Sequence, residues 1–175
     1  SLREMRAFAA EHDQVVVKPL HLMAGQSVFV TGSTDGNHNV ILETVSDFGS
    51  CYTMLQKYLP EIVDSGDKRI FLIDGEAIPM ALVRVPTSGD HRGNMVAGAR
   101  TETRPLTTRD EWICDRIGPS LRDLGLMFVG IDVIGDFMTE VNVTSATGIR
   151  ELERDSDVRV TEQLFDVISS KLPET

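Results

Sequence analysis

Apolar and polar residues alternate on both sides of the pair Gly135-Asp136 in the last third of the sequence. This pattern predicts a β-hairpin with one buried face. The apolar residues fall on one face only if the hairpin loop holds three residues, about Gly135 to Phe137. They are Ile131, Val133, Val141 and Val143. The same register sets Asp132 opposite Glu140, with Asn142 two residues further along.

These three polar residues bring oxygen ligands together on the other face of the predicted hairpin. Mg²⁺ binds hard oxygen donors, commonly one or two carboxylates together with substrate phosphates. A rigid hairpin that carries two carboxylates and an amide therefore suits this ion. On spacing alone, a hairpin with an ordinary solvated polar face remains the alternative.

The remaining pattern predicts an α+β protein. Helices are predicted over 2–12, 40–48, 108–124 and 161–172, and strands over 14–20, 27–31, 51–59, 69–73 and 78–85. Residues 86–106 are rich in Gly, Arg, Thr and Asn, which predicts a long loop. Thr107 or Thr108 is expected to cap the third helix, with Glu111 near the position that a capping box needs. The chain is thus expected to divide into a small lobe, 1–59, and a larger lobe, 60–175.

Composition narrows the classes of partner. The 175 residues are 41% hydrophobic and 25% charged, which suffices for one domain with a core or for two small lobes. The formal net charge of -10 argues against duplex DNA and anionic membranes, because both need a basic patch. Cys51 and Cys114 lack metal-ligand spacing, and we interpret them as reduced thiols of a cytoplasmic protein. No apolar run is long enough to span a bilayer, and no signal peptide opens the sequence.

Several basic and polar residues elsewhere have both a functional and an ordinary structural explanation. Lys18 ends a predicted strand, from which a lysine can reach a phosphate, although a surface lysine has the same pattern. The stretch Gln56-Lys57-Tyr58-Leu59 joins the two lobes, where an extended strand could pair with an adenine edge or simply be buried. Arg69, Arg84 and Arg92 surround a predicted hairpin and could stabilise a phosphoryl group in transfer, but scattered arginines are usually solvated.

From Lys68 to Arg150 the chain resembles the ATP-grasp part of bacterial glutathione synthetase. The matching motifs are Asp67-Lys68-Arg69, Asp74-Gly75-Glu76, Arg84-Val85-Pro86, Arg92-Gly93-Asn94, Arg104-Pro105-Leu106-Thr107, Gly125-Leu126, Phe128 to Asp132, Thr139 to Ser145 and Ile149-Arg150-Glu151. Weaker matches are Val17-Lys18-Pro19-Leu20 and Gln56-Lys57-Tyr58-Leu59-Pro60. Their order and spacing make the resemblance specific, and it covers most of the chain.

The resemblance implies an ATP-grasp fold: two α+β lobes with mainly antiparallel sheets and a nucleotide site between them. It implies a ligase that uses ATP to join γ-glutamylcysteine to glycine through an acyl phosphate. The implied catalytic residues are Arg84, Arg92 and Asn94. The implied nucleotide-binding residues are Lys18, Gln56, Tyr58, Leu59, Asp67 and Arg69. The implied metal ligands, for Mg²⁺ or for Mn²⁺ in its place, are Asp132, Glu140 and Asn142. The implied substrate-binding residues are Arg150, Ser145 and Thr147.

Three departures from the family pattern bear on activity. The segment His21 to Ser27 keeps only Gly25 of the glycine-rich loop that closes over the phosphates in the family, and side chains at the lost glycines restrict positive φ. Ala146 stands where the family commonly has proline, and Gly148 stands where it has a larger residue. The N-terminal domain of the family, which supplies a further nucleotide-contacting lysine, is not among these 175 residues.

Three functions therefore stay open. The first is a glutathione synthetase-type ligase. The second is a catalytically incomplete ATP-grasp fragment or a nucleotide-binding regulatory module. The third is a ligase for another peptide or amino acid. Each implies small-molecule partners and a cytoplasmic protein, without nucleic acid or membrane, and each is compatible with a homo-oligomer.

Overall fold

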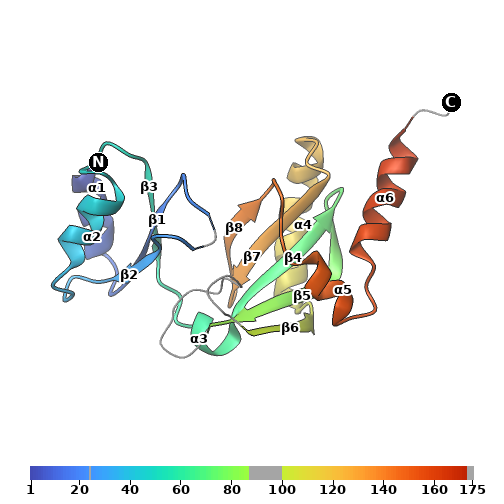
Figure 1. The fold of residues 1–175 in the computed structure, drawn as a ribbon, viewed down its shortest axis with the longest axis horizontal. Coiled ribbons are helices and arrows are strands. Elements are labelled where there is room, and N and C mark those ends of the chain that lie inside the picture. The colour runs from blue at the N-terminus through green and yellow to red at the C-terminus, as the bar shows by residue number, and fades with distance from the viewer. Residues whose placement is uncertain (24, 87–99, 173–175) are drawn as a thin grey trace.

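The computed structural model describes residues 1–23, 25–86 and 100–172. These residues form two separate antiparallel sheets, each with its own helices, connected by the segment that follows the third strand (Figure 1). The expected α+β class with antiparallel sheets is confirmed. Among the described residues, no helix combines the length and the apolarity needed to cross a bilayer.

The N-terminal sheet has the strand order β2-β1-β3. Its strands are β1 (Val15–Pro19), β2 (Phe29–Thr31) and β3 (Thr53–Lys57), and its helices are α1 (Leu2–Ala10) and α2 (His38–Val45). The side chains of β1 alternate, so that Val15 and Val17 are fully buried against the two helices. The opposite face of this sheet carries Val16 and Lys18, which remain partly exposed.

The C-terminal sheet has the strand order β6-β5-β4-β7-β8. Its strands are β4 (Asp67–Ile73), β5 (Glu76–Val85), β6 (Arg100–Pro105), β7 (Phe128–Ile134) and β8 (Phe137–Asn142). Helix α4 (Thr108–Asp123) packs on one face, and α5 (Ile149–Arg154) and α6 (Val160–Lys171) pack on the other. The central strand β4 is apolar at successive positions because Ile70 and Leu72 face α4, while Phe71 and Ile73 face α5 and α6.

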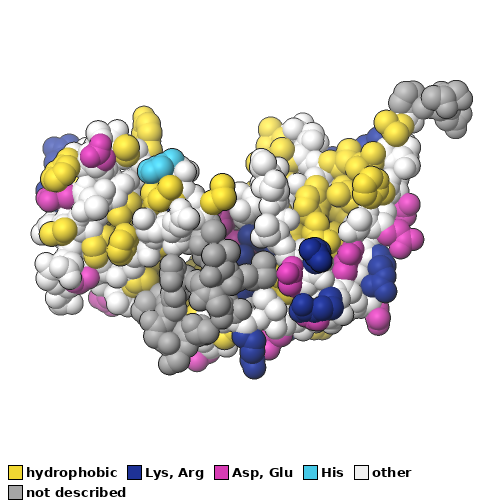
Figure 2. Space-filling view, viewed as in Figure 1, with side chains coloured by type: hydrophobic (Ala, Val, Ile, Leu, Met, Phe, Trp, Pro, Cys, Tyr) yellow, Lys and Arg dark blue, Asp and Glu magenta, His cyan; other side chains and the backbone are white. Residues whose placement is uncertain are grey.

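Helix α6 is only loosely covered by the rest of the fold. Val160 is its single buried residue, and the side chain of Phe165 is 62% exposed. Figure 2 shows hydrophobic side chains gathered at the surface of the C-terminal lobe on the side of this helix, and a notch in the surface between the two lobes.

Most predicted elements are present, with three corrections. The predicted loop 86–106 was wrong for Arg100–Pro105, which form β6 and pair with β5 from Val85 opposite Arg100. Residues 87–99 of that predicted loop lie outside the described part of the chain. The short helices α3 (Ile62–Ser65) and α5 were not expected. Thr107 is the N-cap of α4, but its capping-box partner is Asp110 rather than Glu111.

The predicted hairpin forms with a different loop but with the predicted pairing of its carboxylates. The loop holds two residues, Gly135-Asp136, and a β-bulge at Thr139 supplies the extra residue. Asp132 therefore lies opposite Glu140, as expected. The prediction that Val141 and Val143 are buried was wrong, because β8 is the outer strand and these side chains remain 38% and 49% exposed.

Candidate functional site

The two lobes meet at the outer strand of the C-terminal sheet. In the N-terminal sheet, Val16 pairs with Gln56 and Lys18 pairs with Met54, so these four residues share the face that turns away from the core. The side-chain amide of Gln56 donates from Nε2 to the backbone carbonyl of Thr139 at 2.9 Å, which places this face against β8. Lys18 is close enough to Glu140 for its charge to favour the ionised form of that carboxyl. The inter-lobe junction therefore brings Lys18, Gln56 and Glu140 together.

A buried cluster of acids and arginines lies on one face of the C-terminal sheet. Strand pairing sets Arg69 opposite Asp132 and Asp67 opposite Arg84, and the face continues along β4 into the apolar residues under α5 and α6. Arg69 donates to both oxygens of Asp132, from Nε at 2.5 Å and from Nη2 at 2.9 Å. Arg84 forms ion pairs with Asp67 and, at 3.0 Å, with Asp132. Since Arg69, Arg84 and Asp132 are each no more than 5% exposed, these charges stabilise one another almost without solvent.

The cluster leaves specific atoms unsatisfied. Oδ1 of Asp67 and Nε of Arg84 are buried and make no hydrogen bond with any described residue. Buried polar groups normally have partners, and exceptions occur at sites that bind a ligand or an ion. An unpartnered guanidinium N–H is a donor that a phosphate oxygen can satisfy.

The carboxyl groups of this site differ in the direction in which their pKa values shift. Burial, followed by repulsion from Asp132, raises the pKa of Asp67 to about 7 even though Arg84 opposes the shift. Burial acts in the same direction on Asp132, but the hydrogen bonds and charges of Arg69 and Arg84 outweigh it, and its pKa is lowered. Burial and the neighbouring Asp132 raise the pKa of Glu140. The cluster therefore holds more negative charge than its two arginines neutralise well, and another cation would relieve the excess.

The three predicted metal ligands lie together on the hairpin. Asp132 and Glu140 are paired across β7 and β8, and Asn142 follows on the same strand. The amide nitrogen of Asn142 is buried without a partner among the described residues, so no contact fixes which way this amide points. No cluster of three His, Cys, Asp or Glu side chains with metal-binding geometry occurs in the described ranges. Two carboxylates and an amide are nonetheless a donor set that fits Mg²⁺, whose remaining ligands are commonly water and phosphate.

The segment after β8 connects this cluster to the predicted substrate residues. Arg69 donates from Nη1 to the backbone carbonyl of Thr147 at 3.0 Å, which ties the loop to the same guanidinium that holds Asp132. Ala146 and Gly148 are buried, whereas Ser145, Thr147 and Arg150 are exposed. The loop is thus anchored by two small residues and presents its hydroxyls and Arg150 outward.

Two groups of predicted residues need qualification. The backbone N–H of Tyr58 donates to the carbonyl of Gln14, so in this conformation it continues the sheet and does not face an adenine. The backbone carbonyl of Leu59 accepts from Ile62 at the start of α3. Arg92 and Asn94 lie outside the described residues.

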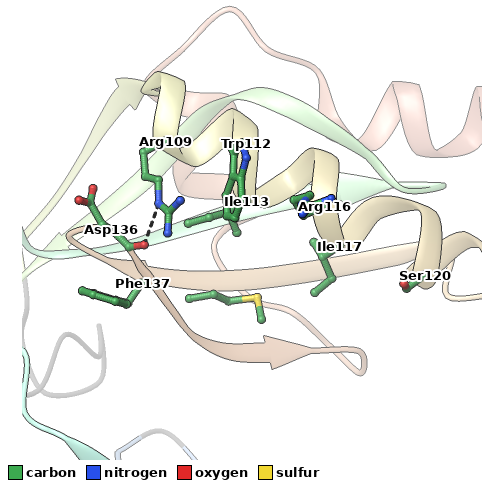
Figure 3. A pocket seen from close by; sticks show the side chains of 9 residues that line it. Arg109, Trp112, Ile113, Arg116, Ile117, Ser120, Asp136 and Phe137 are labelled. Carbon is green, nitrogen blue, oxygen red and sulfur yellow. Dashed lines mark hydrogen bonds between the residues drawn. The ribbon is translucent and has the colours of Figure 1, made fainter.

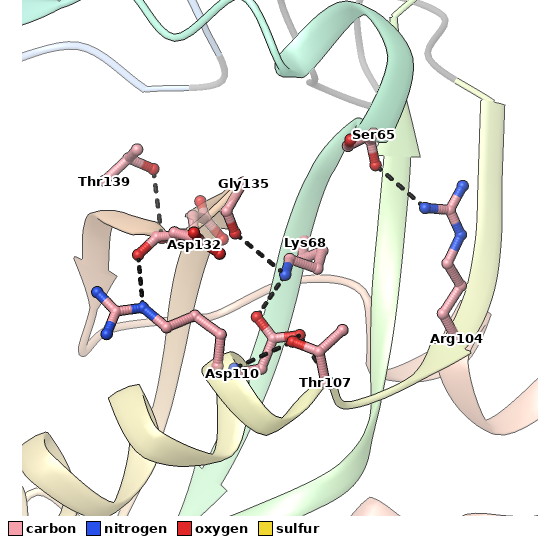
Figure 4. Close-up of polar contacts among 10 residues, drawn as sticks. Ser65, Lys68, Arg104, Thr107, Asp110, Asp132, Gly135 and Thr139 are labelled. Atoms are coloured by element: carbon pink, nitrogen blue, oxygen red, sulfur yellow. Dashed lines mark hydrogen bonds and ion pairs between the residues drawn. The ribbon is translucent and has the colours of Figure 1, made fainter.

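Contacts that were not anticipated from sequence also shape the site. Lys68, next to Arg69 but on the other face, pairs with Asp110 of α4 and reaches the carbonyl of Gly135 at 3.4 Å in the hairpin turn (Figure 4). The motif Asp67-Lys68-Arg69 signalled a functional segment but not this division of its charges between the two faces. The inter-lobe contact of Gln56 with Thr139 had no local signal, because 83 positions separate the two residues.

A groove of about 340 Å³ lies on the other side of the sheet, between α4 and the start of β8. Figure 3 shows Trp112 between Arg109 and Arg116 on its wall, with Arg109 donating to the backbone carbonyl of Asp136 at 3.1 Å. Ile131 and Val133 face α4, so the neighbouring Asp132 points to the opposite face. The groove is therefore not part of the carboxylate site.

Comparisons with known proteins identify the family of the chain. Residues 1–157 match the family model described as prokaryotic glutathione synthetase, ATP-grasp domain. The chain is 51% identical to a glutathione synthetase of Pseudomonas aeruginosa over 168 residues, covering 96% of this chain and 53% of that protein. It is 49% identical to a glutathione synthetase of Coxiella burnetii, covering 98% of this chain and 53% of that protein. The chain thus spans about half the length of the curated relatives it matches.

Solved structures show the same fold at lower sequence identity. The ATP-grasp ligase PsnB, in a complex with a minimal precursor, Mg and ADP, superposes with a TM-score of 0.66 at 19% identity. The match covers 97% of this chain and 50% of that one. A D-alanine–D-alanine ligase from Bacillus anthracis superposes with a TM-score of 0.58 at 14% identity, over 95% of this chain and 56% of that one. The expected ATP-grasp fold is confirmed.

Proposed function

Because the chain belongs to the prokaryotic glutathione synthetase ATP-grasp family, we propose that it is the nucleotide- and metal-binding part of an ATP-dependent carboxylate–amine ligase. In the proposed reaction, the carboxyl group of γ-glutamylcysteine receives a phosphoryl group from ATP, and the amine of glycine then displaces phosphate. The observation that carries this proposal is the buried cluster of Asp67, Arg69, Arg84 and Asp132 beside the inter-lobe junction.

The arginines are proposed to stabilise charge on the transferring phosphoryl group. Such transfers need little acid–base chemistry and depend on positioned cationic groups. Arg84 is suited to this role because its Nε has no partner among the described residues, and its ion pairs hold the guanidinium in place. Arg69 already donates hydrogen bonds to Asp132 and to the carbonyl of Thr147. We therefore assign it to the nucleotide site, where it would hold these two residues in place. Arg92 and Asn94, outside the described ranges, remain proposed catalytic residues from the family motif alone.

The nucleotide is proposed to lie between the exposed face of β1 and β3 and the hairpin. Lys18 would bind phosphate, and Gln56, Tyr58 and Leu59 would line the base together with Asp67 and Arg69 at the cluster. Asp132, Glu140 and Asn142 would hold Mg²⁺, or Mn²⁺ in its place, and the ion would supply positive charge to the phosphates. Arg150, with Ser145 and Thr147, would bind a carboxylate of the acid substrate.

Charge balance supports an ion at the hairpin. Asp132 and Glu140 repel as charges, and desolvation together with Asp132 raises the pKa of Glu140. A carboxyl group with a raised pKa ionises readily when a divalent cation replaces the proton that it would otherwise hold. Carboxylate oxygens have further lone pairs, so Asp132 can keep Arg69 while it contacts an ion.

A catalytically incomplete nucleotide-binding module is the second candidate. The segment that replaces the glycine-rich loop of the family keeps Gly25 at φ +74°, but Ser27 also adopts a left-handed φ of +55°. A side chain at such a position is unfavourable and hinders close approach of the backbone to a phosphate. A ligase for another acid is the third candidate, since Gly148 leaves no room for the larger side chain common in the family.

Binding and turnover measured on the same chain separate these candidates. Calorimetry with ATP and Mg²⁺ is expected to show metal-dependent binding, because the ion ligands and Lys18 are present. Phosphate release with ATP, γ-glutamylcysteine and glycine is expected to be slow. Holding reactants in line is worth up to about 7–11 kcal/mol, and a loosely closed site loses much of that gain. Rapid turnover would contradict the incomplete-module candidate, and absence of MgATP binding would contradict all three.

The accompanying expectations about location and assembly remain proposals. Cys51 and Cys114 are both free thiols, one exposed and one buried, as expected for a cytoplasmic protein. Small molecules are the proposed partners, and we propose neither nucleic acid nor membrane. A homo-oligomer is compatible with the exposed apolar surface beside α6.

A further inference from the structure

Gln56 and the bulge residue Thr139 form a contact that links the two lobes at the edge of the candidate site. In the ladder between β7 and β8, Met138 pairs with Val133 and Glu140 pairs with Asp132, which leaves Thr139 without an opposite residue. The hydroxyl of Thr139 donates to the carbonyl of Asp132 at 3.3 Å and so holds the bulge against β7. Its carbonyl points away and accepts the hydrogen bond from Gln56.

The chemistry of this contact defines the orientation of the Gln56 amide. A backbone carbonyl only accepts hydrogen bonds, so the atom of Gln56 that faces Thr139 has to be Nε2. Gln56 is half-buried on a strand that is itself paired with β1, and Thr139 is held by its own hydroxyl. Both ends of the contact are therefore supported by regular structure rather than by loops.

The position of the contact connects it to the proposed ion site. Glu140 directly follows Thr139, and bulges beside functional sites commonly re-aim the neighbouring side chain. Lys18 shares the sheet face of Gln56, and its charge acts on Glu140 across the junction. The Gln56 contact thus lies between the strand that carries the proposed phosphate lysine and the carboxylate proposed to bind the ion.

We propose that Gln56 is a positioning residue that anchors the bulge carbonyl of Thr139 and thereby sets Glu140 at a fixed distance from the N-terminal sheet. This inference rests on the proposed nucleotide and ion site and adds a coupling between its two halves. Without the anchor, the bulge and the small lobe move independently, and the ion site no longer forms in register with the phosphates held by Lys18. The ion and the nucleotide then bind less cooperatively.

The variant Gln56→Met tests the coupling because methionine keeps the length of the side chain but removes the donor. Affinity for ATP in the presence of Mg²⁺ is expected to fall about fivefold, equivalent to about 1 kcal/mol for one lost hydrogen bond. Affinity for ATP in the presence of a chelator is expected to fall by a smaller factor, because methionine still fills the place of Gln56 beside the base. The matched control is Gln163→Met, which makes the same chemical change on an exposed position of α6. It should leave both affinities unchanged.

Hydrogen exchange without nucleotide provides an independent readout. In Gln56→Met the backbone amides of Glu140 to Asn142 are expected to exchange faster than in the parent, and in Gln163→Met they should not. Equal exchange and equal Mg²⁺-dependent ATP binding in parent and Gln56→Met would overturn the coupling and leave the proposed function standing. A loss of ATP affinity that is the same with and without Mg²⁺ would also overturn it, since Gln56 would then act on the base alone. If the parent itself binds no MgATP, the proposed function fails, and unchanged exchange in Gln56→Met would overturn the anchor as well.

Discussion

The two carboxylates proposed to bind the same ion should differ sharply in what they contribute to folding. Asp132 is 3% exposed. It accepts two hydrogen bonds from Arg69 and forms an ion pair with Arg84. Asp132→Asn removes the carboxylate that these two buried guanidinium groups share, and leaves Arg84 its ion pair with Asp67 while Arg69 keeps no ion-pair partner among the described residues. Breaking a buried ion pair from one side typically costs about 3–5 kcal/mol, and we expect a loss of that size in the free energy of unfolding.

Glu140→Gln should have little effect on folding. Desolvation and the neighbouring Asp132 raise its pKa, so the negative charge that glutamine removes is disfavoured in the folded protein. The variant also removes a like charge from beside Asp132. We expect the free energy of unfolding to change by less than about 1 kcal/mol, within the usual range for substitutions that break no buried pair.

Urea unfolding followed by tryptophan fluorescence measures the difference. Trp112 is the single tryptophan, and it lies on α4. This helix packs against the sheet that carries both substituted residues. With a urea dependence of about 2 kcal/mol per molar, the unfolding midpoint of Asp132→Asn should fall by about 1.5–2.5 M. The midpoint of Glu140→Gln should stay within about 0.5 M of the parent. Equal midpoints for the two variants would refute the role of Asp132 as the counter-ion of the arginines.

Binding separates the structural role from the proposed metal role. Glu140→Gln keeps the fold, so it is the cleaner probe of the ion site, and calorimetry should show weaker Mg²⁺-dependent ATP binding. Asp132→Asn should weaken binding as well, measured under conditions where fluorescence shows it to be folded. If both variants bind MgATP as the parent does, the hairpin is not the metal site.

Two further predictions concern the same lobe. The pKa of Asp67 in the folded protein, about 7, lies above its ordinary value of 3.8, so the stability from this group is present at pH 4 and lost as the pH rises toward 7. Urea titrations from pH 4 to pH 8 should therefore show a decline in the parent that is smaller in Asp67→Asn; parallel profiles would contradict the raised pKa. Gly148→Ala should cost about 1–3 kcal/mol, because φ is +108° and a Cβ would lie 2.7 Å from Cδ2 of Leu82. Gly36→Ala, which meets nothing within 4 Å, is the control, and similar melting temperatures for the two alanine variants would count against the strain.

Local patterns in the sequence were sufficient for most of the fold. The alternation around Gly135-Asp136 predicted the hairpin and the pairing of Asp132 with Glu140, because the bulge at Thr139 compensates for the shorter loop and restores the expected register. The cap at Thr107 and the stop at Gly125 bounded α4 for similarly local reasons. The order of short motifs predicted the family, which the comparisons confirmed.

Other features depended on the neighbours that folding supplies. Strand β6 is polar throughout because it lies at a sheet edge, so its sequence was indistinguishable from a loop until its pairing with β5 was seen. The two-residue loop with a bulge at Thr139 and the predicted three-residue loop give the same carboxylate pairing, so the pattern could not choose between them.

The sequence by itself thus determined the types of residue at the candidate site and the hairpin that carries the carboxylates. Only the tertiary structure decided how their charges are shared. Arg69 and Arg84 read as free cations in the sequence, but adjacent antiparallel strands bury them against Asp132 and Asp67. Burial then separates the pKa values of the acids, because desolvation and the number of neighbouring arginines differ from one carboxyl group to the next. Both depend on distances through space, which the spacing of residues along the chain does not contain.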